Sequence, residues 1–262
     1  MMITCNDIAM AIETLAPKHL AEEWDNVGLL VGREDKMISR VLIALDMDEH
    51  IAREAVETGA DMVLTHHPCM FRAVQRMTED DPQQRAIRTL IRHDICHYAA
   101  HTNLDVATGG LNDFLAQTLG LDHTEVLEVT TPDGQGFGRW CDLPQEIPLG
   151  ALIAQCKQAL GLDGVKYVGD PDRLIKRVAV NSGGGADSMR YCYEKDVDCF
   201  ITGDIKYTAA REAYERGLCL IDAGHYETEI IVQKFYDEFL SKHFPGIERV
   251  LSEYNRKVLQ TG

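Results

Sequence analysis

Histidines and carboxylates in this sequence gather directly after short apolar runs. Six of them follow three such runs: His66 and His67 after 62–65, His101 and Asp105 after 95–99, and His225 and Glu229 after 218–223. Imidazole nitrogens with carboxylate oxygens suit zinc, iron or manganese, and the set is too rich in nitrogen for calcium. One tetrahedral catalytic zinc needs only three protein ligands. Five or six candidates, with a carboxylate able to bridge, therefore favour a centre of two metal ions.

The adjacent pair His66 and His67 needs a special backbone to act at one site. Two neighbouring residues on a regular strand point to opposite faces. Pro68 follows at once, so the strand must end there and the backbone is able to turn. Both imidazoles are then expected to face one cavity, each toward a different ion.

The other candidates share a His-x-x-x-acid spacing, in His101/Asp105 and His225/Glu229. This spacing brings both side chains together if the intervening residues form a helical turn or a tight loop. His101 is the candidate least needed as a ligand, so it is the natural general acid or base. An alternative of equal weight is that His101 does not contact a metal ion but orients a residue that does.

The runs that present these residues belong to a weak internal duplication. The segment 38–45 reappears as 175–182, and in the same register 61–65 falls on 198–202. After a deletion in the second copy, Ala99 falls on Ala223 and the residues up to Asp105 fall on those up to Glu229. Such self-similarity indicates two related structural units.

Each copy alternates short apolar strands with helices, which is typical of an α/β fold with mixed, largely parallel sheets. The predicted strands are 41–45, 62–65 and 95–99, then 178–180, 199–202 and 218–223; the helices between them are 51–58, 83–92, 187–195 and 209–216. Outside the copies, 1–15 and 149–160 read as helices, 126–142 as a hairpin, and 229–243 as one long amphipathic helix.

Composition excludes several classes of protein. The chain has 262 residues, 45% of them hydrophobic, and no apolar stretch approaches the ~20 residues that span a bilayer. A net charge of −16 without a cluster of Lys or Arg argues against nucleic acid as a partner. The eight cysteines form no Cys-x-x-Cys pair and several sit in apolar runs, so we expect reduced, mostly buried thiols and a cytoplasmic location.

Two further segments have open interpretations. Ser182-Gly183-Gly184-Gly185 lies between a strand and a helix, where it either cradles phosphate or allows close helix packing. Asp25-Asn26 precedes a strand and forms either a turn or part of the cavity. Gly203-Asp204 stands where the first copy has its histidine pair, so we expect one shared centre.

Six motifs together resemble the Nif-three-like (NGG-interacting-factor-three) family, whose members are often labelled GTP cyclohydrolase I type 2 homologues. They run in order along the chain: Trp24-Asp25-Asn26-Val27-Gly28-Leu29, Leu64-Thr65-His66-His67-Pro68, Ala100-His101-Thr102-Asn103-Leu104-Asp105, Lys166-Tyr167-Val168-Gly169-Asp170, Phe200-Ile201-Thr202-Gly203-Asp204 and Gly224-His225-Tyr226-Glu227-Thr228-Glu229. The chain resembles the compact form, which lacks an inserted domain.

The resemblance implies two intertwined, similar α/β lobes, with residues 1–125 plus 230–262 in the first, 126–229 in the second, and the metal site between them. It implies a homohexamer, a trimer of dimers, with dinuclear sites facing an internal cavity. It also implies a ligand set, with Glu229 bridging two divalent ions: His66, His67, Asp105, His225 and Glu229.

Three functions are compatible with such a centre. The first is a metal-dependent hydrolase of a purine nucleotide, with GTP ring opening as the named candidate, in which the ions offset the negative field of an acidic protein. The second is a non-catalytic, metal-holding oligomer that binds partners or metabolites. The third is a general phosphoesterase. The ligands alone do not separate these functions.

Overall fold

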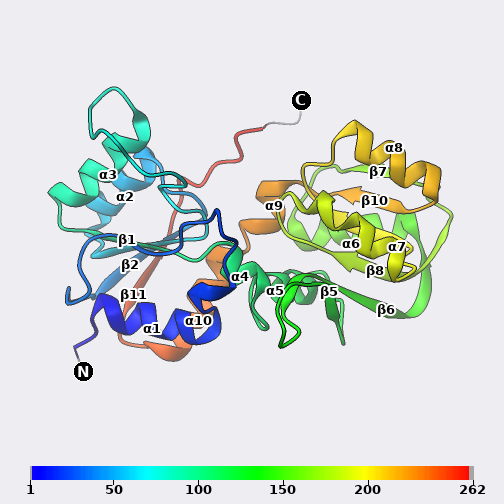
Figure 1. Cartoon of the computed structure of the whole chain (residues 1–262), viewed down its shortest axis with the longest axis horizontal. Helices are drawn as coiled ribbons and strands as arrows, with labels where there is room; N and C mark the ends of the chain where they lie inside the picture. Colours follow the sequence, from blue (N-terminus) through cyan, green and yellow to red (C-terminus); the bar gives the residue numbers. More distant parts are fainter. Residues whose placement is uncertain (1, 260–262) are drawn as a thin grey trace. The chain divides into compact units, whose positions relative to one another are not determined.

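The chain folds into two compact units, each made of a central sheet with helices on both faces. This computed structural model describes residues 2–259; Met1, part of the predicted helix 1–15, and residues 260–262 lie outside the described range. One unit contains residues up to Leu104 and those from Val232 onward, and the other contains Asp105–Ile231. Figure 1 shows the order of the elements along the chain.

The sheet of the first unit has the strand order β1-β4-β3-β2-β11. Its strands are β1 (Gly28–Val31), β2 (Arg40–Ala44), β3 (Met62–Thr65), β4 (Cys96–Ala99) and β11 (Glu248–Leu251). The four strands from β4 to β11 are parallel, and β1 pairs antiparallel with β4. The carboxyl ends of β2, β3 and β4 therefore lie at one edge, where ligands gather in open α/β sheets.

Helices cover both faces of this sheet (Figure 1). They are α1 (Cys5–Leu15), α2 (Glu49–Thr58), α3 (Pro82–Arg92) and α10 (Val232–His243). Leu42 and Val63 pack with α2 and α3 in one apolar cluster. Their neighbours Val41 and Met62 are fully buried too and point to the opposite face, because side chains alternate along a strand. Burial on both faces explains why these strands are continuously apolar.

The sheet of the second unit has the order β5-β6-β8-β9-β10-β7. Its strands are β5 (Glu125–Val129), β6 (Gly136–Pro148), β7 (Lys166–Val168), β8 (Leu174–Val180), β9 (Cys199–Thr202) and β10 (Cys219–Asp222). Only its centre, β8-β9-β10, is parallel. The predicted hairpin forms β5 and β6 and adds antiparallel pairs, so both sheets are mixed, as expected, and the first is the more parallel of the two.

Helices of the second unit also occupy both faces of its sheet. They are α5 (Leu111–Thr118), α6 (Leu149–Leu160), α7 (Met189–Glu194), preceded by a 3-10 turn at Gly185–Ser188, and α8 (Tyr207–Arg216). Val178 and Ile201 face α5 and α6, whereas Ala179 and Phe200 face α7 and α8. The helix predicted over 187–195 is thus partly a 3-10 turn.

The internal duplication is visible in the topology. In the first unit β1 precedes the parallel strands β2, β3 and β4 and pairs antiparallel with β4. In the second unit β7 precedes the parallel strands β8, β9 and β10 and pairs antiparallel with β10. In both units helices join the three parallel strands. The Asp61 carboxylate accepts hydrogen bonds from the backbone N–H groups of Ser39 and Arg40 at the start of β2. Asp198 does the same for Lys176 and Arg177 in the first half of β8. Both aspartates occupy the positions that the sequence alignment paired.

The alignment of the third strands was wrong by one residue. Thr65 pairs with Ala99 in the first sheet, and the equivalent Thr202 pairs with Asp222 in the second, so Ala99 corresponds to Asp222 and not to Ala223. The following helices, α4 (Thr102–Val106) and α9 (His225–Glu229), begin in the same shifted register. His225 is therefore the counterpart of Thr102, and the two His-x-x-x-acid motifs are not equivalent.

The boundaries between the units differ from the expected ones. The chain leaves the first unit after Leu104, 21 residues before the expected boundary after residue 125. The physical reason is α5, whose Leu115 packs into the core of the second unit, and Asp113, which pairs with the buried Arg139 of β6 at 2.7 Å. At the other end, the predicted helix 229–243 is broken after Glu229, and α10 starts at Val232.

The cysteines are as expected from their apolar surroundings. All eight are free thiols and all are buried. Burial raises the pKa of most of them; that of Cys69, Cys156 and Cys192 rises to about 12. Within residues 2–259, no helix combines the length and the apolar character that crossing a bilayer requires.

Candidate functional site

The first unit gathers three histidines at the carboxyl edge of its sheet. β3 ends at Thr65, and the next two residues, His66 and His67, leave the strand geometry. Their ring centroids are 5.2 Å apart, and the ring of His101, which follows β4, lies 5.0 and 5.3 Å from them. One nitrogen of each ring lies within 4.8 Å of the others. The two neighbouring imidazoles thus lie side by side, as the turn before Pro68 predicted.

Each of these imidazoles is oriented through its Nδ1 atom. Nδ1 of His66, which is fully buried, donates to the carbonyl oxygen of Ala100 at 2.9 Å. Nδ1 of His67 donates to the Asp46 carboxylate at 2.7 Å. A ring that donates from Nδ1 carries its lone pair on Nε2, which is the tautomer that binds a metal.

His101 is held by a carboxylate that has no solvent exposure. Asp25 accepts a hydrogen bond from Nδ1 of His101 at 3.0 Å and another from the backbone N–H of Thr102 at 3.0 Å. Burial by itself would raise the pKa of Asp25, but the bonds from His101 and Thr102 outweigh it and lower that pKa to about 2. Asp25 is therefore anionic at neutral pH and fixes the tautomer and orientation of His101.

A buried network supports the turn that carries the histidine pair. The Thr65 hydroxyl donates to the carbonyl oxygen of His67 at 2.7 Å and accepts from Nε2 of His97 at 2.8 Å. Nδ1 of His97 then accepts from the Cys69 thiol at 3.1 Å. Full burial lowers the pKa of His97 to about 3, so this imidazole is neutral and its role here is structural.

The second unit contributes a histidine and a carboxylate from one short helix. His225 and Glu229 are the first and last residues of α9, and Nε2 of His225 lies 3.0 Å from Oε2 of the buried Glu229. Nδ1 of His225 donates to Asp204 at 2.8 Å. Glu229, with help from Asp204, raises the pKa of His225 to about 9 although burial opposes this. The predicted one-turn contact of this His-x-x-x-acid pair is confirmed.

Asp105 and Glu229 both reach the segment Ser182–Gly183. The Ser182 hydroxyl donates to Oδ1 of Asp105 at 3.0 Å. Gly183 has a left-handed backbone (φ +61°), and a Cβ atom at this position would lie 2.1 Å from Oε1 of Glu229. A side chain at 183 would force the Glu229 carboxylate to move, and the left-handed backbone also favours glycine here.

The same glycine-rich segment does not form a phosphate cradle. The backbone N–H of Ser182 donates to the Asn112 side chain at 2.9 Å. The N–H groups of Gly183 and Gly185 donate to the hydroxyls of Thr228 and Thr202, each at 2.9 Å. These N–H groups already donate to side chains within the unit and are not available to a phosphate. The close-packing interpretation is therefore correct, and the phosphate-binding interpretation is wrong.

Sequence reasoning found the histidines but missed most of the groups that orient them. Asp46 and Asp204 were not proposed as partners of His67 and His225, and His97 was overlooked. Asp46 follows the end of β2, and Asp204 follows β9 where the first copy has its histidines, so both lie at the carboxyl edges of strands. That position was the available signal. Asp25, which was weighed as either a turn residue or part of the cavity, holds His101.

The donor chemistry fits divalent metal ions. In both units the imidazoles donate from Nδ1 to an oxygen, an arrangement that is usual for metal-binding histidines. Nε2 of His225, which donates to Glu229 while the ring is protonated, would bind a metal after losing that proton. A buried glutamate and an aspartate add oxygen donors. The fold and these residues together define an α/β protein with histidine-rich sites of metal-binding type.

Comparison with known proteins identifies the family. Residues 3–257 match the model of Duf34/NIF3 (NGG1p interacting factor 3), and the chain belongs to this family. A relative from Clostridium perfringens named "GTP cyclohydrolase 1 type 2 homolog" is 40% identical over 225 residues, which cover 86% of each chain.

Solved structures agree with the family assignment. "The Crystal Structure of Bacillus cereus protein related to NIF3" matches with a TM-score of 0.90 at 26% identity and covers 100% of both chains. "Reduced HcgD from Methanocaldococcus jannaschii" matches with a TM-score of 0.83 at 32% identity, over 97% of this chain and 99% of that one.

Proposed function

We propose that this protein is a dinuclear metal-dependent hydrolase acting on a nucleotide, with GTP ring opening as the candidate reaction. The observation that carries the proposal is the uniform orientation of four imidazoles: His66, His67, His101 and His225 each donate from Nδ1 to an oxygen. The name printed for its relatives, "GTP cyclohydrolase 1 type 2 homolog", supports the choice of substrate.

We propose five residues as the ligands of two zinc, iron or manganese ions per chain: His66, His67, Asp105, His225 and Glu229. When bound, such ions polarise the substrate and make water a better nucleophile near neutral pH. The residues do the positioning. Asp46 and Asp204 fix the rings of His67 and His225, and Gly183 leaves the space that the Glu229 carboxylate occupies.

In this proposal, His101 moves the proton. Ring opening adds water to the imidazole carbon C8 of the purine, breaks the C8–N9 bond and delivers a proton to N9. His101, held by Asp25 through Nδ1 with its lone pair on Nε2, is oriented to take a proton from the water and return it to the leaving nitrogen. Asp25 stabilises the protonated ring while that proton is held.

The test is a nucleotide turnover screen on protein of measured metal content. We expect slow hydrolysis of a purine nucleotide by the wild type, loss of both turnover and metal in His67→Ala, and loss of turnover with retained metal in His101→Ala. His19→Ala, an exposed histidine in a short 3-10 turn, is the matched control and should change neither. Full metal occupancy without turnover of any nucleotide would contradict the hydrolase and leave a metal-holding binding protein.

The homohexamer is a separate proposal. Static light scattering should give six times the mass of one chain. The mass of a monomer would contradict it without affecting the assignment of the ligands.

A further inference from the structure

The loop between β3 and α3 forms a polar pocket in the first unit. It begins with His66 and His67 and ends at Asp81, which caps α3 by accepting from the N–H of Gln84 at 3.2 Å. The Gln84 side chain accepts from the backbone N–H of Thr78 at 2.7 Å. These hydrogen bonds fix the end of the loop to the first turn of α3.

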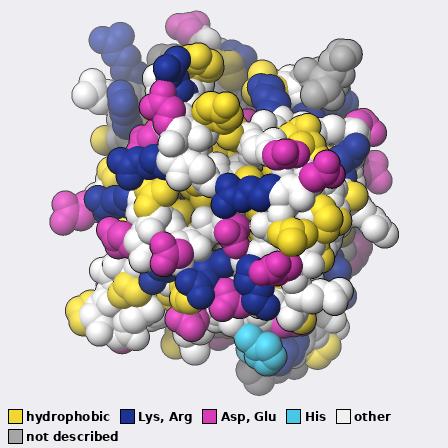
Figure 2. All heavy atoms as spheres, turned by 90° about the vertical axis from the view of Figure 1, so that its right-hand side faces the viewer, with side chains coloured by type: hydrophobic (Ala, Val, Ile, Leu, Met, Phe, Trp, Pro, Cys, Tyr) yellow, Lys and Arg dark blue, Asp and Glu magenta, His cyan; other side chains and the backbone are white. Residues whose placement is uncertain are grey.

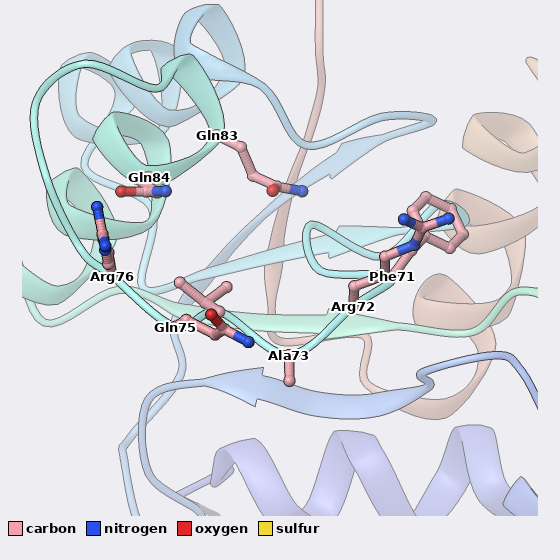
Figure 3. Close-up of a pocket in the computed structure, with 8 residues that line it drawn as sticks. Phe71, Arg72, Ala73, Gln75, Arg76, Gln83 and Gln84 are labelled. Carbon is pink, nitrogen blue, oxygen red and sulfur yellow. The ribbon is translucent and has the colours of Figure 1, made fainter.

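The pocket has the size of a small-molecule site and an uncharged or basic lining. Its volume is about 490 Å³, within the range of ligand pockets. Figure 3 shows Arg76 and Gln84 on one side, Phe71 with Arg72 on the other, and Gln83 between them. No carboxylate belongs to this lining. The lining side chains offer hydrogen-bond donors, and none of them is acidic.

The two arginines are unusual in an acidic chain. Most arginines are neutralised by a carboxylate, and Figure 2 shows basic and acidic side chains interspersed on one face of the molecule. The nearby Glu79 follows this pattern, since it pairs with Arg88 at 2.6 Å and with Arg92 at 3.5 Å. Within residues 2–259, neither Arg72 nor Arg76 forms an ion pair. Their charge is uncompensated in a chain whose net charge is −16.

The loop pocket, lined by these residues, adjoins the histidines of the first unit. Phe71 lines the pocket, and its ring makes an edge contact with His101, with centroids 5.6 Å apart. A ligand that reaches His101 can therefore extend into the loop pocket past Phe71. The anionic part of such a ligand and His101 would then both contact the loop between β3 and α3.

We propose that the loop pocket binds the phosphate groups of the substrate, with Arg72 and Arg76 as the cationic partners. This inference rests on the proposed function and assigns the residues that bind the phosphate groups of its substrate. Guanidinium groups bind phosphate oxygens by paired, charge-assisted hydrogen bonds. Local positive charge also offsets the repulsion that an acidic protein exerts on an anion.

The test is calorimetric titration of the full chain with inorganic tripolyphosphate, first as purified and again after metal removal with a chelator. We expect binding in both states, weakened about tenfold in the double variant Arg72→Ala/Arg76→Ala. The pair Arg72→Lys/Arg76→Lys should bind with intermediate affinity. Arg53→Ala is the matched control, because Arg53 on α2 also lacks an ion pair within residues 2–259 but lies outside the pocket; it should bind like the wild type.

Two outcomes would overturn the proposal: wild-type protein that does not bind tripolyphosphate, or a double alanine variant that binds as tightly as the wild type. Thermal unfolding at the wild-type midpoint would show that the exposed substitutions left the fold intact. Because the chelated protein is measured without turnover, failure of this proposal is distinguishable from failure of the hydrolase. If the protein hydrolyses nucleotides but the arginine substitutions do not weaken tripolyphosphate binding, the phosphate groups of the substrate bind outside the loop pocket.

Discussion

Replacing Gly183 by alanine is a sharp test of the metal centre, because it moves a proposed ligand without removing it. The new Cβ atom would lie 2.1 Å from Oε1 of Glu229 and 3.3 Å from Nε2 of His225. Non-bonded atoms need more than about 3 Å, so the Glu229 carboxylate must shift by about 1 Å. Metal–ligand distances tolerate only about 0.2 Å. We therefore expect the metal affinity to fall at least tenfold, in the range of other disturbances to ligand orientation.

The backbone cost of this substitution must be separated from the collision. Gly183 has a φ of +61°, where alanine costs roughly 1–2 kcal/mol. Gly161, at the end of α6, has a φ of +67°, and a Cβ atom added there would meet no other atom within 4 Å. Gly161→Ala therefore carries the same strain without the collision. We expect both variants to lose stability in urea unfolding, and only Gly183→Ala to lose metal affinity.

The assay is a competitive metal titration against a chromophoric chelator, with urea unfolding of the same samples. Equal metal affinity in Gly183→Ala, Gly161→Ala and the wild type would refute the reasoning. It would mean that the Glu229 carboxylate does not hold metal in the position that the glycine leaves open. A loss of affinity in both variants would refute it as well, since backbone strain alone would then be sufficient.

Three further predictions concern stability and proton transfer. Arg139→Met leaves Asp113 without the buried guanidinium that it contacts at 2.7 Å, and should destabilise the second unit by about 3 kcal/mol in urea unfolding. Burial would raise the pKa of Asp61, but its hydrogen bonds at the start of β2 lower it below the usual value, so its stabilising contribution is present above about pH 4 and lost in acid. The stability difference between the wild type and Asp61→Asn should therefore shrink as the pH falls from about 6 to about 3, and a constant difference would contradict this. Asp25→Asn should reduce kcat about a hundredfold or more with the metal content unchanged, because the amide no longer holds His101 in the required tautomer; an unchanged kcat would exclude this role.

The repeating elements could be predicted from sequence because the apolar pattern, the turn residues and the internal repeat all indicated the same boundaries. β3, β9 and α6 begin and end at the predicted residues, since each is a continuous apolar or amphipathic run bounded by turn residues. The duplication was detectable because aspartates at 61 and 198 cap the same strand starts in both copies. Local chemistry of this kind repeats along the chain and needs no knowledge of tertiary contacts.

What the sequence did not predict depends on tertiary packing. The break between α9 and α10 falls within an apolar stretch, at Ile230 and Ile231, which by themselves would continue a helix. The chain leaves the first unit earlier than predicted because α5 packs against a sheet formed by residues later in the sequence. The one-residue error in aligning His101 with His225 arose because matching residue types outweighed sheet register, which only the strand pairing reveals.

Partners across the fold were hidden for the same reason. Asp25 and His101 are separated by 75 intervening residues, and no periodicity connects them. Asp204 looked like the loss of a histidine pair, although it supplies the acceptor that orients His225. An acidic residue just beyond a strand end is therefore a useful signal when histidines lie beyond neighbouring strands.

The central claim is that His66, His67, Asp105, His225 and Glu229 hold two metal ions. The most direct measurement is a crystal structure of the metal-loaded protein with diffraction data collected across the absorption edge of the bound metal. We predict two anomalous peaks per chain about 3.5–4 Å apart, in contact with Nε2 of His66, His67 and His225 and with the carboxylates of Asp105 and Glu229. Full metal loading with peaks only at other residues, or with a single ion away from Glu229, would contradict the claim.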